Sequence, residues 1–376
     1  MIERALSKNI SSDLGLGKAI IILGPRQVGK TTLVKEIASR YPGDHLYLNG
    51  DLSAVQELLA ERNLEAIRRV IGENQLVILD EAQRIAEIGL KLKIITDELP
   101  NVQLLVTGSS SLDLSFGLSE SLTGRKFEHY MHPISYGELV ANWGPIRAKE
   151  SLEARLRYGS YPEVVNNPGK ERRYLDLIAD SYLYRDLIDQ SAVRRVALLK
   201  KILQALAFQV GNEVSYNEVA RTVGADRGTV ESYIDLLEKA FVIFRLPSLS
   251  RNLRNEIKQG RKVYFWDNGI RNALIANFNP LTLRQDTGGL WENFLVAERQ
   301  KLKHYSQQYA NCYFWRTYTQ QEIDYIEEAD GKIRAYEFKW NPKKRGRMPK
   351  IFAAAYPNSE IVTVNRDNFV PFLSEF

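Results

Sequence analysis

Residues 24–31 follow the pattern G-x(4)-G-K-T, which places a lysine and a threonine directly after a glycine-rich turn. Backbone N–H groups of such a loop, and of the helix after it, point at phosphate oxygens and favour negative charge. Lys30 would reach the β- and γ-phosphates, and the Thr31 hydroxyl would ligate Mg²⁺. We therefore expect ATP and Mg²⁺ to bind here. The residues expected to contact the nucleotide are Gly24, Pro25, Arg26, Gln27, Val28, Gly29, Lys30, Thr31 and Thr32.

Two carboxylates, Asp80 and Glu81, follow the apolar run 76–79, which predicts a buried strand. Ligands of open α/β sheets bind at the carboxyl ends of the strands. Asp80 would hold Mg²⁺ through water, while Glu81 would polarise the attacking water. An Asp-Glu pair favours hydrolysis over a simple binding switch. The alternative is a pair of acids that only cap a strand.

Two further side chains could complete this site. Ser109 follows a third apolar run, 103–107, and could contact the γ-phosphate or the lytic water; an ordinary serine-rich turn is the alternative. Arg125 could act as an arginine finger on the nucleotide of a neighbouring subunit, which would imply a homo-oligomer such as a hexamer. A simple surface arginine is the alternative.

A second constellation lies in the last third of the chain. Glu292 is expected on a helix and Asp324 on a strand, and Glu337 and Lys339 share one face of a second strand, because strand side chains alternate. This arrangement matches the PD-(D/E)xK nucleases. Asp324 and Glu337 would bind Mg²⁺, and Lys339 would orient or deprotonate the attacking water. A fold that keeps these residues as a structural polar cluster is the alternative.

Two basic segments could contact DNA phosphates. Residues 339–350 contain no acid, and their Pro and Gly disfavour a long helix; a solvated loop is the alternative. Residues 215–246 read as helix, turn, helix and strand, the winged-helix order, whose second helix would enter a major groove. Acids on that helix keep a protein–protein role open. The candidate DNA-contacting residues are Arg227, Thr229, Ser232, Arg251, Arg254, Lys258, Arg261, Lys262, Lys343, Lys344, Arg345 and Arg347.

The elements that must position these residues divide the chain into four predicted domains. Short apolar strands alternate with helical segments over 1–145, which predicts an α/β core with a parallel sheet. A helical lid follows over 146–200, where a turn could place Pro162 against the adenine; a plain interhelical turn is the alternative. The remaining predicted domains are a winged helix over 201–262 and an α/β domain over 263–376.

Composition restricts the class of protein. The chain has 376 residues, 44% of them hydrophobic, and a net charge of +5, which is consistent with a polyanionic partner. The single cysteine, Cys312, excludes an intrachain disulfide and fits a cytoplasmic location. No apolar run approaches the ~18 residues of a membrane span, and the first residues show no signal-peptide pattern. We therefore expect no membrane partner.

These motifs, taken in order, resemble the bacterial and archaeal AAA-type ATPases that pair an ATPase core with a C-terminal DUF4143 domain. The resemblance spans nearly the whole chain. It implies a P-loop AAA-type core with a parallel sheet and helical lid, followed by a winged-helix domain and an α/β restriction-endonuclease-like domain. Gly159-Ser160 departs from the usual Gly-Gly of that family. The matching segments are residues 24–32, 79–83, 107–110, 122–125, 159–163, 184–186, 262–269, 290–293 and 337–339.

Three functions compete on these observations. The first is an ATPase that binds DNA, branched DNA included, and remodels or translocates it as an oligomer. The second is an ATP-gated nuclease that uses the C-terminal constellation. The third is a nucleotide-dependent switch that acts on a protein partner. Salt separates the first two from the third, because DNA contacts release counterions and weaken steeply with salt, whereas an apolar protein interface does not.

Overall fold

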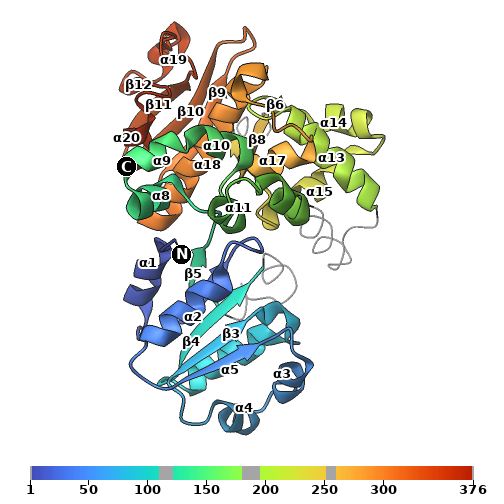
Figure 1. Cartoon of the computed structure of the whole chain (residues 1–376), viewed down its shortest axis with the longest axis vertical. Helices are drawn as coiled ribbons and strands as arrows, with labels where there is room; N and C mark the ends of the chain where they lie inside the picture. Colours follow the sequence, from blue (N-terminus) through green and yellow to red (C-terminus); the bar gives the residue numbers. More distant parts are fainter. Residues whose placement is uncertain (1, 110–121, 180–194, 251–259, 375–376) are drawn as a thin grey trace. The chain divides into compact units, whose positions relative to one another are not determined.

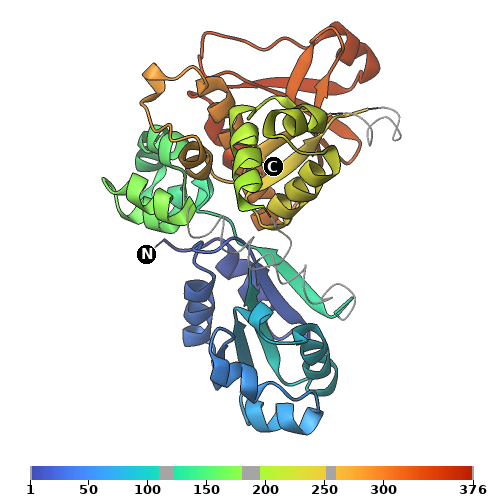
Figure 2. The ribbon, with the colours of Figure 1, turned by 90° about the vertical axis from the view of Figure 1, so that its right-hand side faces the viewer.

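The structure is a computed structural model of the chain, and it describes residues 2–109, 122–179, 195–250 and 260–374. The chain forms two compact units (Figures 1 and 2). Unit 1 consists of Met1–His132 and Lys239–Phe241, and unit 2 of Pro133–Glu238 and Val242–Phe376. No helix among these described residues is both long enough and apolar enough to cross a membrane.

Unit 1 contains a five-stranded parallel sheet in the order β2-β3-β4-β1-β5. The predicted α/β core with a parallel sheet is therefore confirmed. The apolar runs that predicted strands are fully buried in β1, β3 and β4, as expected for the central strands of a sheet covered on both faces. The strands are β1 (Ala19–Leu23), β2 (His45–Asn49), β3 (Leu76–Asp80), β4 (Gln103–Gly108) and β5 (Lys126–Tyr130).

Helices connect these strands and pack on the sheet, as Figure 1 shows for α2 and α5. Because β1, β4 and β3 run parallel to one another, the phosphate loop after β1 and the acids at the end of β3 lie at the same carboxyl edge. The helical segments are α1 (Leu6–Asp13), α2 (Lys30–Arg40), α3 (Ser53–Leu58), α4 (Leu64–Ile71), α5 (Ile88–Glu98) and the 3₁₀ turn η1 (Ala82–Arg84).

Unit 2 begins with short helices. A capping box starts the first of them: the Ser135 hydroxyl accepts from the Glu138 N–H, and the Glu138 carboxylate accepts from the Ser135 N–H. Glycines with positive φ end two of these helices, at Gly144 and Gly159. The helices are α8 (Tyr136–Trp143), α9 (Pro145–Glu150), α10 (Leu152–Tyr158) and α11 (Pro162–Asn166).

The described residues in the middle of unit 2 form α13, α14 and α15 beside a three-stranded antiparallel sheet in the order β6-β8-β7. Ser215 caps α14, and Gly224 ends it in the left-handed conformation, so the turn to α15 is short. The elements, in chain order, are α13 (Val196–Phe208), β6 (Glu213–Val214), α14 (Tyr216–Val223), α15 (Arg227–Lys239), β7 (Ile243–Pro247) and β8 (Arg261–Phe265).

The rest of unit 2 is built on a four-stranded mixed sheet in the order β12-β11-β10-β9. This sheet joins the preceding one, because the Leu249 N–H donates to the Phe314 carbonyl at 2.7 Å and the Leu249 side chain packs in the same apolar core. The elements are α17 (Asn268–Leu274), η2 (Leu281–Leu283), α18 (Thr287–Ser306), β9 (Asn311–Arg316), β10 (Glu322–Ala329), β11 (Lys332–Phe338), α19 (Lys350–Ala355), β12 (Ser359–Val364) and α20 (Phe369–Ser374).

Candidate ATPase site and acid–lysine cluster

The phosphate loop lies between β1 and α2, in the strand–loop–helix context that the pattern requires. Gly24 allows a close approach of two segments, because a Cβ there would lie 2.1 Å from the Met131 carbonyl oxygen. Lys30 is buried, and its Nζ donates to the carbonyls of Gly24 (2.8 Å) and Pro25 (2.9 Å). Its ammonium is thus held at the loop, where a phosphate oxygen could replace a carbonyl as acceptor.

A buried arginine that no motif indicated braces this loop. Arg4 donates from Nη1 to the Val28 carbonyl at 2.5 Å and from Nη2 to the His132 carbonyl at 2.6 Å. Hydrogen bonds from a charged donor are among the stronger ones in proteins. Arg4 therefore ties the phosphate loop to the segment that follows β5.

Asp80 is fixed at the end of β3 by two hydroxyl groups. It is 2% exposed, its Oδ1 accepts from the Thr107 hydroxyl, and its Oδ2 accepts from the Tyr47 hydroxyl at 2.6 Å. Burial and the Asp80 carboxylate raise the pKa of Tyr47, so this hydroxyl remains a donor. The carboxylate oxygens keep lone pairs for a water on Mg²⁺, and with the Thr31 hydroxyl they are the hard oxygen donors that this ion prefers.

Glu81 follows in a left-handed backbone conformation, with φ 49° and ψ 43°. Its N–H donates to Thr107 Oγ1 at 3.1 Å, and its Oε2 accepts from Gln83 Nε2 at 2.5 Å. A non-glycine residue in this conformation is strained by about 1–3 kcal/mol and persists only when its surroundings hold it. Thr107 contacts both acids, and the sequence did not single it out because it lies within the run 103–107 that predicted a strand.

The two other predicted members of this site have different surroundings. Ser109 lies buried just after β4. Arg125 is partly exposed, and its Nε donates to Asp97 Oδ1 on α5 at 2.5 Å. An arginine finger would have to exchange this carboxylate for a phosphate. Whether Ser109 or Arg125 contacts a nucleotide stays a prediction.

In unit 2 the structure brings together the four residues of the second predicted constellation. The hairpin register places Tyr325 opposite Tyr336, and hence Asp324 on β10 opposite Glu337 at the end of β11. Lys339 Nζ lies 2.8 Å from Glu337 Oε2 and 3.8 Å from Asp324 Oδ2. Glu292 on α18 completes the group through its electrostatic interaction with Asp324. We call these residues, together with Lys262, Tyr264 and Glu322, the acid–lysine cluster.

Three of those residues were not predicted to belong here. Lys262 was expected among the phosphate-contacting cations of a wing, but this is wrong, because Lys262 is 0% exposed and points inward. Its Nζ lies 2.8 Å from Glu292 Oε1 and 2.5 Å from Glu322 Oε1. The Tyr264 hydroxyl donates to Glu292 Oε1 at 2.6 Å. Both residues come from β8, so this strand reaches into the cluster.

Burial and mutual repulsion shift the titration of the carboxyl groups. Burial, aided by Asp324 and opposed by Lys262, raises the pKa of Glu292 to about 7. Burial and Asp324, opposed by Lys339, raise the pKa of Glu337 to about 7 as well, and burial raises that of Asp324. Although burial alone would lower the pKa of Lys262, the Glu292, Asp324 and Glu322 carboxylates raise it. The lysines thus remain charged beside acids that hold protons easily.

As the side chains lie, the acid–lysine cluster is not arranged as a metal site. Within residues 2–109, 122–179, 195–250 and 260–374, no group of three or more His, Cys, Asp or Glu is placed to hold a metal ion. Lys339 lies where a cation between Asp324 and Glu337 would lie, and its ammonium supplies the positive charge. We therefore derive no chemical step through a metal in this cluster.

Arg261, one of the predicted DNA-contacting residues, is half-buried on β8. Others lie at two further places in unit 2. Arg227, Thr229 and Ser232 lie on α15, where the Thr229 hydroxyl donates to Asp226 at 2.6 Å and the Ser232 hydroxyl to the Gly228 carbonyl at 2.9 Å. A second group is exposed on the loop between β11 and α19: Lys343, Lys344, Arg345 and Arg347. The residues that lie outside the described part of the chain are Arg251, Arg254, Lys258 and the motif 184–186.

The turn expected near the adenine packs within unit 2. A Cβ on Gly159 would lie 1.9 Å from Asp267 Oδ1, and the Ser160 N–H donates to Asp267 Oδ2 at 2.6 Å. A Cβ on Gly269 would meet the Tyr158 carbonyl at 2.1 Å. Two of the motifs that carry the family resemblance are therefore packed against each other. Pro162 follows as the first residue of α11, and its contact with adenine stays a prediction.

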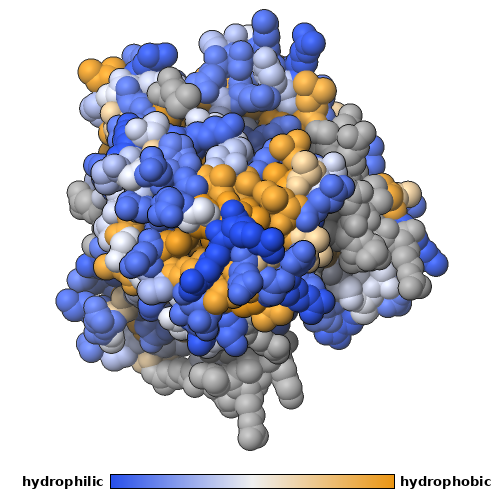
Figure 3. Space-filling view, turned by 90° about the horizontal axis from the view of Figure 1, so that it is seen from below, coloured by the Kyte–Doolittle hydropathy of each residue, from blue (hydrophilic) through white to orange (hydrophobic). Residues whose placement is uncertain are grey.

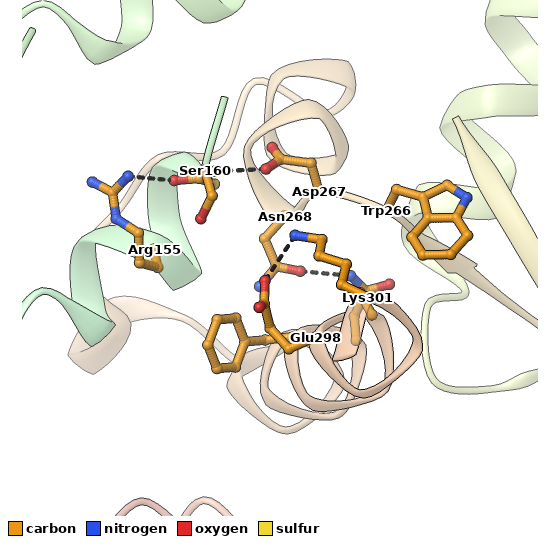
Figure 4. A pocket seen from close by; sticks show the side chains of 11 residues that line it. Arg155, Ser160, Trp266, Asp267, Asn268, Glu298 and Lys301 are labelled. Carbon is orange, nitrogen blue, oxygen red and sulfur yellow. Dashed lines mark hydrogen bonds and ion pairs between the residues drawn. The ribbon is translucent and has the colours of Figure 1, made fainter. Parts of the chain in front are cut away.

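A polar cavity of about 10 Å³ lies beside this turn, between α10, the residues before α17, and α18 (Figure 4). It has room for about one water molecule. Arg155, Asp267, Glu298 and Lys301 line it as two cations and two acids, and Lys301 donates to Glu298 at 2.7 Å. Burial raises the pKa of Asp267, and Lys301 opposes this. The balance of charge and the small volume indicate a structural network.

Three family models match the chain. The description AAA domain applies to residues 16–140, domain of unknown function DUF8612 to residues 149–281, and domain of unknown function DUF4143 to residues 287–375. The match to an AAA domain and to DUF4143 confirms the resemblance at this level. The nuclease-like nature of the DUF4143 segment does not follow from it.

Two related proteins each match more than two thirds of this chain. An uncharacterised protein of Mycobacterium tuberculosis is 26% identical over 324 residues, which is 85% of this chain and 70% of that protein. An uncharacterised protein of Haemophilus influenzae is 28% identical over 289 residues, which is 68% of this chain and 69% of that protein.

Two solved structures are similar to parts of the fold. A Walker-type ATPase of Pyrococcus abyssi matches with a TM-score of 0.48 and 16% identity, over 73% of this chain and 96% of that chain. The RuvB Holliday junction branch migration motor of Thermotoga maritima matches with a TM-score of 0.33 and 20% identity, over 68% and 91%. Both TM-scores are too low to add to the case for function. The AAA domain match, joined to the phosphate loop and its acids, supports a nucleotide-hydrolysing ATPase of the AAA type.

Proposed function

We propose that this ATPase binds DNA and uses ATP hydrolysis to remodel or translocate it as a homo-oligomer. The hydrolytic part is supported by the AAA domain match and by the arrangement of Lys30, Asp80 and Glu81. The DNA part is supported by one observation above all, the way in which the basic loop of unit 2 is fixed with its cations exposed.

This basic loop, residues 343–347, is held against the acid–lysine cluster. The Gly346 N–H donates to Thr363 Oγ1 at 3.0 Å, and a Cβ on Gly346 would lie 2.5 Å from Glu337 Cβ. The loop therefore needs a glycine to lie this close to Glu337. The four cations of the loop face solvent, where they can replace the counterions of a phosphate backbone.

The middle of unit 2 supports a winged helix as a second DNA contact. Its order of helix, strand, two helices and two further strands is the winged-helix order, and α15 would be the recognition helix. The exposed Arg227 favours DNA, but the same helix carries the acids Asp235 and Glu238, which pair with Arg245 and thereby occupy its charge. Because α15 carries charges of both signs, the basic loop is the stronger support for DNA binding.

The proposed hydrolysis uses residues of unit 1. Lys30 would exchange its carbonyl acceptors for β- and γ-phosphate oxygens, and Glu81 would accept the proton of the attacking water. Mg²⁺, when bound through Thr31 and Asp80, would neutralise charge on the phosphates. Thr107 would hold Asp80 and Glu81 in one geometry, since its hydroxyl contacts both.

Two features are consistent with an oligomer. Arg125 lies partly exposed and could reach a neighbouring nucleotide after leaving Asp97. The view in Figure 3 shows hydrophobic residues gathered into an area bordered by hydrophilic ones, as subunit contacts often are. In unit 1, large apolar side chains are exposed at Leu16, Leu52 and Leu58.

The second candidate function is DNA cleavage at the acid–lysine cluster, favoured by the meeting of Asp324, Glu337 and Lys339 next to a basic loop. Against it stands the position of Lys339 between the two acids. Incubation of plasmid DNA with the protein, ATP and Mg²⁺ or Mn²⁺ tests this function. Cleavage by the wild type but not by Asp324→Asn would support a nuclease. Cleavage equal in both proteins would point to a contaminant.

Binding of labelled DNA at several salt concentrations tests the DNA part. Lys343→Ala/Lys344→Ala should weaken binding and reduce the salt slope by about 2, near one unit for each phosphate that a lysine no longer neutralises. Arg68→Ala/Arg69→Ala, which removes two exposed charges from α4 of unit 1, is the matched control. Equal weakening in both variants would mean that the basic loop makes no specific contact with DNA.

A further inference from the structure

Gln83 lies beside the hydrolytic acid and ends the matching segment 79–83, but the sequence assigned it no chemical role. It belongs to the 3₁₀ turn η1 directly after Glu81, and it is 8% exposed. Its Nε2 donates to Glu81 Oε2 at 2.5 Å. The amide nitrogen of this buried glutamine is therefore bound to the carboxylate of Glu81, and the amide oxygen is left to contact another group.

The orientation of this amide follows from chemistry. A carboxylate only accepts hydrogen bonds, so the NH₂ end of Gln83 must face Glu81 and the oxygen must face away from it. That oxygen, Oε1, is buried and has no hydrogen-bond partner within the described protein. An unsatisfied buried acceptor costs about 1–3 kcal/mol, and such atoms usually have a functional or solvent partner.

The turn that carries both side chains is held in place from several directions. The Glu81 N–H is bound to Thr107 Oγ1, and a Cβ on Gly50 would come within 2.5 Å of the Glu81 carbonyl oxygen. Glu81 itself has a left-handed backbone. A strained turn that is fixed in this way can hold two acceptors, Glu81 and Gln83 Oε1, in one geometry.

We propose that Gln83 Oε1 accepts a hydrogen bond from the attacking water, so that Gln83 and Glu81 orient this water together. The inference rests on the proposed role of Glu81 in ATP hydrolysis. A water that attacks phosphorus directs a lone pair at the phosphorus, and both of its O–H groups then need acceptors. Glu81 supplies one acceptor, and Gln83 Oε1 supplies the other.

The chemical step balances with these residues. The water oxygen forms a bond to the γ-phosphorus, and the bond from that phosphorus to the β–γ bridging oxygen breaks, with its electron pair leaving on ADP. The proton of the O–H that faces Glu81 passes to the Glu81 carboxylate. Gln83 neither gains nor loses a proton, because its only task is to fix the second O–H.

Steady-state hydrolysis by Gln83→Leu tests this role, since leucine keeps the volume and removes both polar ends. We expect kcat to fall about 10- to 100-fold with KM for Mg·ATP unchanged, because only the transition state loses an interaction. Gln75→Leu is the matched control, because Gln75 is a glutamine outside the site that precedes the same strand, β3, at its other end. It should keep wild-type kcat.

A binding readout accompanies turnover. ADP with aluminium fluoride mimics the transferring phosphoryl group, and Gln83→Leu should bind it more weakly by about the factor by which kcat falls, while ADP alone binds as in the wild type. Glu81→Gln/Gln83→Leu should be no slower than Glu81→Gln alone, since residues that act as a unit are not additive. Should Gln83→Leu fail to fold, Gln83→Met carries the same expectations.

Two results would overturn the proposal, and they differ from each other. If wild-type protein hydrolyses ATP and Gln83→Leu keeps kcat within twofold, Gln83 does not orient the water, while the ATPase assignment stands. If the wild type itself shows no turnover above that of Lys30→Ala, the proposed hydrolytic role fails, and the role of Gln83 fails with it.

Discussion

The ATPase site of unit 1 and the acid–lysine cluster of unit 2 both contain lysine and acidic side chains. The two sites differ in the groups that these side chains contact. In unit 1, Lys30 donates to the backbone carbonyls of Gly24 and Pro25, and Asp80 accepts from the hydroxyls of Tyr47 and Thr107. In unit 2, Lys262 and Lys339 lie directly on carboxylates.

This difference indicates different tasks. Neutral hydrogen-bond partners orient Lys30 and Asp80 at the carboxyl edge of the sheet, and polar groups oriented in advance are the condition for electrostatic catalysis. A buried ion pair satisfies itself and is costly to break. We therefore expect unit 1 to determine ATP turnover, whereas the cluster in unit 2 determines stability and supports the basic loop.

The largest effect on activity is expected at the hydrolytic carboxylate of unit 1. Glu81→Gln should lower ATP turnover by about 10²- to 10⁴-fold, because the acceptor of the water proton is removed. Nucleotide affinity should persist, since Glu81 is not part of the phosphate loop. Turnover and binding of a fluorescent ATP analogue check both points. Turnover at the wild-type rate would show that another residue acts as the base.

The next effect concerns unit 2. Lys262→Met should destabilise the protein by about 3–5 kcal/mol, because Glu292 and Glu322 would lose the buried cation between them. Urea unfolding measures the change, with the exposed Lys332→Met as control. ATP turnover per folded molecule should stay at the wild-type level. A large loss of turnover with unchanged stability would reverse the roles that we assign to the two regions.

The stability of unit 2 should depend on pH through its buried carboxyl groups. Folding raises the pKa of Glu337 from 4.5 to about 7, so the folded protein keeps a proton that the unfolded chain releases first. The stability that this group contributes is complete below pH 4.5 and is lost as the pH rises to about 7. Thermal unfolding without metal should follow this fall, and Glu337→Gln should reduce it, leaving the part that Glu292 contributes over the same range.

A matched variant controls this measurement. Glu360→Gln, at an exposed position on β12, should follow the wild-type pH profile. The same fall in all three proteins would mean that Glu337 does not titrate in this range, and the charge balance that we infer for the cluster would be wrong.

The smallest expected effect tests the link between the cluster and DNA. Gly346→Ala places a Cβ against Glu337 and should displace the basic loop, which we expect to weaken DNA binding only a few-fold, since no charge is removed. Gly331→Ala is a poor control because Gly331 has a positive φ; Gly288→Ala, with open space around it, is better. Unchanged DNA affinity in Gly346→Ala would separate the loop from the cluster.

Much of unit 1 could be predicted from sequence because its signals are local. The apolar runs before Gly24 and Asp80 are buried strands, and the phosphate-loop pattern lies between a strand and a helix. Tyr47 and Thr107 could not be found in this way. They contact Asp80 from neighbouring strands, and only the strand order of the sheet shows that their hydroxyls meet it.

In unit 2 the sequence contains a signal for the hairpin that brings the acids together, in addition to the spacing of the acids. Asp330 and Gly331 both have positive φ, as in the tight hairpin turn that an Asp-Gly pair favours. A turn centred there fixes the register that sets Asp324 opposite Glu337. Lys262 could not be assigned, because its place among basic residues suggests solvent, whereas packing of β8 on α18 turns it inward.

We propose that ATP hydrolysis by this chain acts on DNA. The most direct test measures ATP turnover with single-stranded, duplex and four-way DNA, at low and moderate salt, beside Lys30→Ala. We predict that at least one form of DNA raises turnover, less so at higher salt, and that Lys30→Ala stays inactive. Clear basal turnover that no form of DNA changes would contradict the claim and favour a switch that acts on a protein partner.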